Sequence, residues 1–201
     1  MIVYIRGVSF YNKGSELMLC AIVEYLRQTV PRVRFAVDPH VGTYEQRAQY
    51  GLLQRVEGFG RRMRFWTRSL VAGAYLAQLG IVFDADIDLI LDASGFAYGD
   101  QWEPERSERM AKAAQKWTQH GKAVILMPQA LGPFENPRIC AAFARIVDCA
   151  DLIFARDQMS YAHVEATGVP LDGITIAPDF TVLVEGKVPD YYDPVRHQAC
   201  I

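Results

Sequence analysis

Short apolar runs alternate with longer amphipathic segments from the N-terminus to about residue 185. Runs such as DLILDA, KAVILMP and DLIFA are nearly continuous in apolar residues and rich in Leu and Ile. Such runs are typical of parallel strands whose two faces are both covered by helices. The alternation therefore predicts an α/β fold with a Rossmann-like, doubly wound and mostly parallel sheet.

Six strands and six helices are expected from this alternation. The strands are expected at residues 2–6, 33–37, 88–93, 123–128, 152–155 and 174–177. The helices are expected near residues 15–29, 43–54, 60–80, 104–120, 136–148 and 157–167. Apolar residues of the first helix fall near helical spacing and predict one buried stripe, made of Leu17, Cys20, Ala21, Val23 and Leu26.

The apolar stretch at residues 70–83 is too short to cross a membrane. It falls well short of about 20 residues, and Asp84 and Asp86 follow it. We therefore expect a packed helix there and no transmembrane segment. The N-terminus has neither a basic start nor a long apolar core, so it does not resemble a signal peptide.

The character of the sequence changes near residue 185. The segment EGKVPDYYDPVRHQACI contains two prolines and several polar residues and shows no clear period. We expect one Rossmann-like domain at residues 1–185. Residues 186–201 are expected to form a linker toward a second domain that is absent from this chain.

The charge balance argues against nucleic acid as a partner. The formal net charge is −2 at pH 7, whereas phosphate binding normally leaves a basic surface. The basic run Arg61-Arg62-Met63-Arg64 is interpreted as a solvated helix face.

The cysteines indicate neither a metal site nor a disulfide framework. No C-x-x-C or other metal-ligand spacing occurs among Cys20, Cys140, Cys149 and Cys200. Free thiols in apolar settings fit a reducing compartment. We expect a cytoplasmic protein, either free or peripheral at the inner face of the membrane.

Ligands of open parallel sheets bind at the carboxyl ends of the strands, so the loops that follow strands are the candidate site. The first loop contains Asn12, Lys13, Gly14 and Ser15. Gly14 permits a close turn, Ser15 could cap the next helix, and a helix start attracts anions. A capped turn without a ligand explains the same residues. The loop matches neither a dinucleotide nor a nucleoside-triphosphate motif.

The second loop, LDASGFAYGDQW at residues 91–102, offers Ser94, Gly95 and Asp100 as binding residues. Aromatic side chains interleave with these residues and suit stacking on a sugar ring: Phe96, Tyr98 and Trp102. The alternative is a long loop whose aromatic side chains complete the core.

The third and fourth loops follow the next two strands. In LMPQALGPF, Gln129 can donate and accept hydrogen bonds, and Gly132 fixes the turn into the next helix. In IFARDQMSY, Arg156 ends a strand and can bind a carboxylate or phosphate through two bonds. A structural pair with Asp157, which is expected to cap a helix, is the alternative. Asp179 in APDFTVL could bind a hydroxyl or brace a turn.

The histidines give weaker indications. His40 follows a strand and is the best candidate for a general base among the four, but we interpret it first as a solvated loop histidine. His120 is expected at a helix end, and His163 and His197 are scattered elsewhere in the sequence. No catalytic triad or glycosidase carboxylate pair can be assigned, so no catalytic residue is placed.

Taken together, these loops resemble the polysaccharide pyruvyl transferase family. The resemblance covers about 180 residues and is carried, in order, by NKGSELMLCAI, ASGFAYGDQW, PQALGPF, RDQMSYAHVEATGV and APDF. It implies one half of an enzyme with two Rossmann-like halves, like the GT-B glycosyltransferases. It also implies transfer of pyruvate from phosphoenolpyruvate to a sugar of a cell-envelope polysaccharide or exopolysaccharide, which forms a ketal.

The resemblance assigns roles to two positions of this chain. Arg156 matches the family's arginine that contacts phosphoenolpyruvate, and Gly14 matches the glycine of its first loop. Ser15 and Glu16 stand where many members have aspartate. The family's general acid is a histidine of the second half, so this chain alone is expected to turn over weakly or not at all. Phosphoenolpyruvate is implied as the co-substrate, without a metal or other cofactor.

Two other functions fit the same residues. One is half of a GT-B-type glycosyltransferase that uses a nucleotide sugar, and the other is a non-catalytic carbohydrate-binding or interaction module. Apolar surface exposed where a second half would sit favours a homo-oligomer. The expected partners are phosphoenolpyruvate and a carbohydrate acceptor, without nucleic acid.

Overall fold

The computed structural model describes residues 1–57, 76, 78–186, 190 and 193. The helices and 3-10 turns are α1 (Lys13–Thr29), α2 (Tyr44–Gln49), η1 (Asp84–Asp86), α5 (Pro104–Thr118), α6 (Pro137–Val147), α7 (Gln158–Ala166) and η2 (Phe180–Leu183). The strands are β1 (Ile2–Arg6), β2 (Arg34–Val37), β3 (Leu52–Val56), β4 (Ile81–Phe83), β5 (Leu89–Asp92), β6 (Phe96–Tyr98), β7 (Ala123–Leu131), β8 (Leu152–Ala155) and β9 (Ile174–Ile176).

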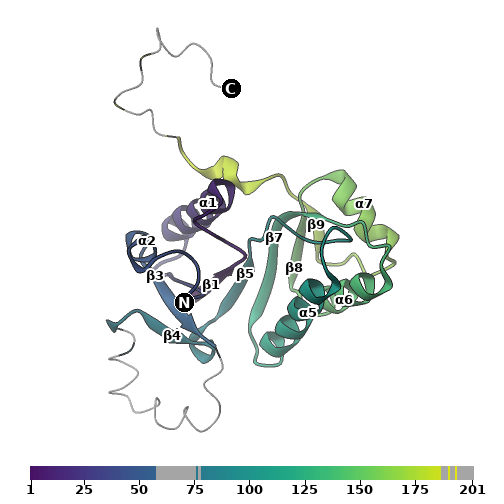
Figure 1. Ribbon diagram of the computed structural model, residues 1–201, viewed down its shortest axis with the longest axis horizontal. Helices are drawn as coiled ribbons and strands as arrows, with labels where there is room; N and C mark the ends of the chain where they lie inside the picture. Colours follow the sequence, from purple (N-terminus) through teal and green to yellow (C-terminus); the bar gives the residue numbers. More distant parts are fainter. Residues whose placement is uncertain (58–75, 77, 187–189, 191–192, 194–201) are drawn as a thin grey trace.

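Every pairing between the described strands is parallel. The strand order is β4-β3-β2-β1-β5-β7-β8-β9, and β6 adds a short pairing to β7. The sheet first grows from β1 toward β4, and then continues on the other side of β1 with β5 (Figure 1). This reversal defines a doubly wound sheet, so the Rossmann-like α/β fold is confirmed.

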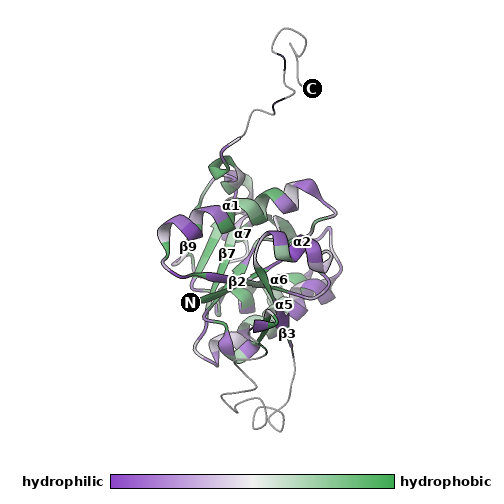
Figure 2. Cartoon of the chain, turned by 90° about the vertical axis from the view of Figure 1, so that its left-hand side faces the viewer, coloured by the Kyte–Doolittle hydropathy of each residue, from purple (hydrophilic) through white to green (hydrophobic). Residues whose placement is uncertain are grey.

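Helices cover both faces of the sheet, as continuous apolar strands require. On one face, Leu19 and Ile22 of α1 pack against strand residues such as Ile5. On the other face, residues of α5 and α6, including Met110 and Ile146, form a second cluster. In Figure 2 the central strand β7 is mainly hydrophobic, whereas the helices carry both hydrophilic and hydrophobic residues. Within the described residues, no helix has the length and apolar character needed to cross a membrane.

The buried face of α1 differs from the predicted stripe. Leu17 is 40% exposed, whereas Leu19 and Ile22 are buried. Ser15 is buried on the same side and accepts a hydrogen bond from the backbone N–H of Ser9 at 2.8 Å. The prediction for Leu17 is wrong, because the face of α1 that packs on the sheet is the one that carries Leu19 and Ile22; Ala21 and Val23 are buried as expected.

The helix expected at residues 43–54 is partly wrong. A capping box at Thr43 starts α2, but the helix ends at Gln49. Gly51 then adopts a φ of 63°, which L side chains rarely tolerate, and β3 begins directly after it. The helix expected over residues 70–83 is wrong at residues 81–83, which form β4 and pair in parallel with β3.

Each of the six predicted strands matches an observed strand to within three residues at either end. The largest difference is at β7, which extends to Leu131. The helix expected at residues 60–80 and the basic run at 61–64 lie almost entirely outside the described residues. The division into a domain at 1–185 and a linker at 186–201 stays a prediction.

Candidate functional site

The sheet reverses its direction of growth between β1 and β5, and ligands of doubly wound folds bind at such a switch point. The carboxyl ends of these two strands are Arg6 and Asp92, which are paired in the sheet. The loops that follow them contain the first two predicted groups of site residues. The switch point therefore lies where the sequence places its candidate site.

In the first loop, Asn12 and not Ser15 caps α1. The Oδ1 atom of Asn12 accepts hydrogen bonds from the backbone N–H groups of Gly14 and Ser15, at 2.9 and 3.2 Å. Lys13 is 85% exposed and forms an ion pair with Glu16 at 2.6 Å. This bond to Lys13 lowers the pKa of the Glu16 carboxyl. Two backbone N–H groups at the start of α1 are thus already hydrogen-bonded within the chain.

The first and second loops contact each other closely. Gly7 adopts a φ of 78°, and a Cβ atom there would lie 2.6 Å from the Cα atom of Ser94. A Cβ atom at Gly95 would lie 3.1 Å from the Cε atom of Met18 in α1. Glycine is therefore required at Gly7 for the two loops to approach.

Four donors converge on the carboxylate of Asp92, which is fully buried. Arg6 donates to Oδ2 at 2.7 Å, and the hydroxyl of Tyr98 donates to the same oxygen. The backbone N–H of Ser94 donates to Oδ1 at 3.0 Å, as does its hydroxyl. Burial alone lowers the pKa of Arg6, but Tyr98 and Asp92 outweigh it and raise that pKa. Neither Arg6 nor Asp92 is among the site residues predicted from the sequence; their place at the ends of two predicted strands is the signal that could have found them.

The aromatic side chains of the second loop divide between two roles. Tyr98 is 1% exposed and belongs to the core, as the alternative interpretation expects. Phe96 is 37% exposed and packs edge-on against Trp102, with ring centroids 5.9 Å apart. The guanidinium of Arg106 lies over the Trp102 ring at 4.1 Å. Phe96 is therefore the exposed aromatic among the three.

Asp100 and Gly132 join the second loop to the third. The carboxylate of Asp100 accepts from the backbone N–H groups of Glu135 and Asn136, at 2.6 and 3.1 Å. Gly132 has a φ of 80°, and a Cβ atom there would lie 2.5 Å from the Cβ atom of His163 in α7. Both residues thus fix loop geometry, which positions the strand ends around them.

Gln129 lies in β7 between the second and fourth loops. Its backbone carbonyl accepts from the N–H of Arg156 at 3.0 Å, and the next N–H, of Ala130, donates to Gly95 at 2.9 Å. Its side chain is 0% exposed, and neither amide atom has a hydrogen-bond partner in the described part of the chain. Such a group is uncommon in a folded protein.

Arg156 lies at the end of β8 and faces Asp179 across a loop. Its Nη1 atom is 3.9 Å from Oδ2 of Asp179, and the two side chains are 37% and 41% exposed. Asp157 caps α7 by accepting from the N–H of Ser160 at 2.7 Å, as predicted, and this bond lowers its pKa. Asp179 caps η2 through Thr181. The guanidinium is therefore held less tightly than the other cations of this edge.

The contacts of the three described histidines do not indicate a catalytic role. His40 is exposed, and Nδ1 of His120 lies 2.6 Å from the carbonyl of Lys116. His163 packs against Gly132, and His197 lies outside the described residues. In the described ranges no three metal-binding side chains form a cluster.

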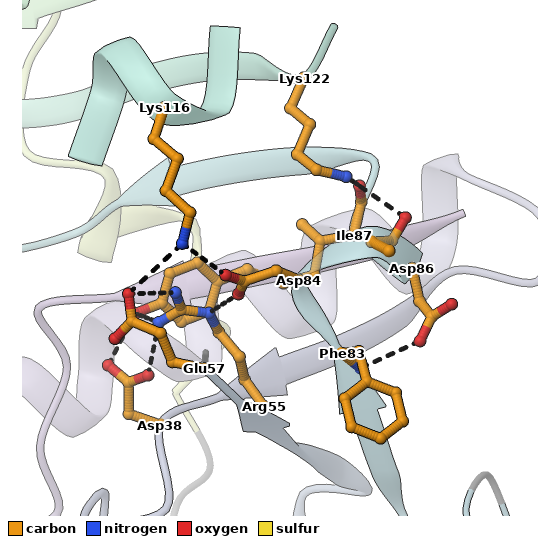
Figure 3. Close-up of polar contacts among 11 residues, drawn as sticks. Asp38, Arg55, Glu57, Phe83, Asp84, Asp86, Ile87, Lys116 and Lys122 are labelled. Carbon is orange, nitrogen blue, oxygen red and sulfur yellow. Dashed lines mark hydrogen bonds and ion pairs between the residues drawn. The ribbon is translucent and has the colours of Figure 1, made fainter. Parts of the chain in front are cut away.

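A second polar cluster lies at the ends of β2, β3 and β4 (Figure 3). Its centre is Arg55, which is 4% exposed and contacts Asp38 at 2.9 Å, Asp84 at 2.7 Å and Glu57 at 3.4 Å. Lys116 of α5 contacts Asp84 at 3.1 Å. Burial alone would raise the pKa of Asp84, but its bonds to Arg55 outweigh that effect and lower it. This cluster joins three strands to α5.

Comparisons with known proteins agree with the fold. A family model described as polysaccharide pyruvyl transferase matches residues 12–199. Among solved structures, the Anabaena protein Alr3699/HepE in complex with UDP and glucose is 14% identical, over 88% of this chain and 44% of that one, with a TM-score of 0.51. The same protein with UDP gives 11% identity, 89% and 43% coverage and a TM-score of 0.50. No curated protein matches the chain.

The chain spans less than half the length of the Anabaena protein. At these identities the likeness shows the fold alone, and it agrees with one half of a GT-B-type architecture. The family model is stronger evidence, because it covers nearly all of the 201 residues. The chain belongs to the polysaccharide pyruvyl transferase family.

Proposed function

We propose that the protein transfers pyruvate from phosphoenolpyruvate to a sugar of a cell-envelope polysaccharide or exopolysaccharide and forms a ketal. Arg156 carries the proposal: it directly follows β8, at the edge where ligands of such sheets bind, in a chain of this family. Its guanidinium is partly exposed, and the carboxylate of Asp179 lies at the outer limit of an ion pair. Such a guanidinium can bind a carboxylate or phosphate through two parallel hydrogen bonds.

The proposed reaction adds one proton to the methylene carbon of phosphoenolpyruvate, which becomes a methyl group. A sugar hydroxyl attacks the adjacent carbon and loses its proton, which balances the proton added to the methylene carbon. The C–O bond to phosphate breaks with its electron pair going to the phosphate oxygen. A second hydroxyl of the same sugar then forms the second C–O bond of the ketal, and its proton leaves with inorganic phosphate. Arg156 binds the anion and stabilises charge that develops on it. The proposed proton donor is the histidine that the family resemblance assigns to a second half.

Titration calorimetry with phosphoenolpyruvate tests the proposal. Arg156→Ala should weaken binding by about 10- to 100-fold, the effect of losing a charged two-bond contact. Arg145→Ala is the matched control, because Arg145 is an exposed arginine of α6 and should leave affinity unchanged. Absence of binding to the unaltered protein, or equal losses in both variants, would refute the role of Arg156.

A nucleotide sugar is the second candidate ligand, because the similar Anabaena structures contain UDP. The same calorimetry with UDP separates the two functions. Binding of UDP without binding of phosphoenolpyruvate would favour a glycosyltransferase. The proposed reaction uses no metal or other cofactor and takes place in the cytoplasm, which the free cysteines favour.

A further inference from the structure

The carboxylate of Asp92 has no capacity left for another donor. A carboxylate has about four lone-pair positions, and Asp92 accepts from Arg6, from Tyr98 and twice from Ser94. Asp92 forms an ion pair with Arg6 at 2.7 Å, and an ionised carboxylate has no proton, so it accepts at each position and donates nothing. Its complete burial excludes solvent as a competing partner.

This arrangement fixes the direction of the hydrogen bond of Ser94. A serine hydroxyl has one proton to donate and two lone pairs to accept. The proton of Ser94 is directed to Asp92, because an ionised carboxylate has no proton to donate to it. Ser94 is half-buried, so the lone pairs of its hydroxyl can accept from a ligand. A ligand group that meets Ser94 must therefore be a donor, as a sugar hydroxyl is.

The charges along this edge of the sheet separate a place suited to an anion from a place suited to a neutral group. Near the switch point, Arg6 is paired with Asp92 at 2.7 Å and Lys13 with Glu16 at 2.6 Å. Toward β8, Arg156 has its carboxylate contact at 3.9 Å. An anion is stabilised by a cation that is not already neutralised. The β8 end therefore suits an anion, and the switch point suits a neutral group.

We propose that Ser94 accepts a hydrogen bond from a hydroxyl of the acceptor sugar, and that Asp92 is the positioning residue that orients the serine hydroxyl. This inference rests on the proposed function and divides its site in two. The sugar lies over the ends of β1 and β5, and phosphoenolpyruvate lies over the end of β8. Ser94 is then a specificity-determining residue for the sugar and has no part in binding phosphoenolpyruvate.

Deoxyfluoro sugars test this direction, because fluorine replaces a hydroxyl without a proton to donate. The probes are the methyl glycosides of glucose, galactose and mannose and their monodeoxyfluoro analogues, with binding measured by ligand-observed NMR. For a bound parent sugar, one fluoro position should bind the unaltered protein about fivefold more weakly, the effect of one hydrogen bond. In Ser94→Ala, the parent and that analogue should bind equally.

Two controls separate this role from a general loss of structure. Thr118→Ala removes a hydroxyl at the end of α5 that bonds only to helix carbonyls, and it should keep the fluorine effect. Phosphoenolpyruvate should bind Ser94→Ala as tightly as the unaltered protein. Asp92→Asn, verified as folded by its thermal transition, should also lose the fluorine effect, because an amide can turn a donor toward Ser94.

Three results would overturn the inference. They are a fluorine effect that persists in Ser94→Ala, a phosphoenolpyruvate affinity that falls with the sugar affinity, and no binding of any parent glycoside. Each differs from failure of the proposed function, in which the unaltered protein does not bind phosphoenolpyruvate.

Discussion

Replacing Gln129 with methionine should stabilise the protein. The amide of Gln129 is 0% exposed, and both of its polar atoms lack a partner among the described residues. A buried polar group without a partner costs about 1–3 kcal/mol, and an apolar group of similar shape removes that cost. Methionine has nearly the same length and fills irregular spaces in cores. The expected gain in the free energy of unfolding is therefore about 1–3 kcal/mol.

Urea denaturation and thermal unfolding measure this gain. For a chain of this length, 1 kcal/mol corresponds to about 2–4 °C in the melting temperature. Gln101→Met is the matched control, because the amide of Gln101 donates to the carbonyl of Gly132 at 3.1 Å. The same substitution there removes a hydrogen bond and should lower stability or leave it unchanged, since Gln101 is exposed.

Replacing Gln129 with methionine should weaken ligand binding while it raises stability. If the Gln129 amide is retained for a ligand, the methionine variant gains stability and loses affinity for phosphoenolpyruvate or sugar. This combination is the usual signature of a polar group kept at a functional site. A variant that is less stable than the original protein would refute the reasoning, because the amide would then have a partner that methionine cannot replace.

Three further predictions concern the polar clusters and the switch point. Arg55→Leu should lower the free energy of unfolding by about 2–4 kcal/mol in urea titrations, less than for a fully buried pair because its carboxylate partners are partly exposed; Arg34→Leu, at an exposed position, should have little effect. The pKa of Asp84 is lowered in the folded state, so its contribution to the free energy of unfolding should be complete above its unfolded pKa of about 4 and be lost as pH falls through the folded value. Urea titrations over this pH range should show that loss in the unaltered protein and not in Asp84→Asn. Gly7→Ala should destabilise the fold and abolish sugar binding in NMR titrations, because its Cβ would lie 2.6 Å from the backbone of Ser94.

Most strands could be predicted because each is a short, nearly continuous apolar run. Strands β1 and β8 were predicted with the observed bounds, at Ile2–Arg6 and Leu152–Ala155. Strands β3 and β4, at one edge of the sheet, were predicted as helix. Strand β3 contains Gln54 and Arg55, whose polar groups are satisfied by the side chains of α2 and by the cluster around Arg55. These polar residues interrupt the apolar run expected of a buried strand, so the sequence does not distinguish β3 from the helix before it. The parallel pairing with β2 makes this segment a strand.

The candidate loops could be predicted as a group because topology alone brings the ends of parallel strands to one edge. What each side chain does there depends on partners far away in the sequence. Asp100, for example, accepts from backbone groups 35 and 36 residues later, and Arg6 meets Asp92 across 86 residues. No local pattern contains such pairings.

The same dependence explains why residue type does not identify a ligand at this edge. Arg6, Lys13 and Arg156 are all cations near strand ends or helix starts, yet two of them lie within 2.7 Å of a carboxylate and the third is 3.9 Å from one. A cation already paired closely offers little to a phosphate, whereas one held at 3.9 Å can exchange its partner for a ligand at small cost. The structure thus distinguishes Arg156 by the weakness of its internal contact, and this is the property that the calorimetric comparison of Arg156→Ala with Arg145→Ala measures.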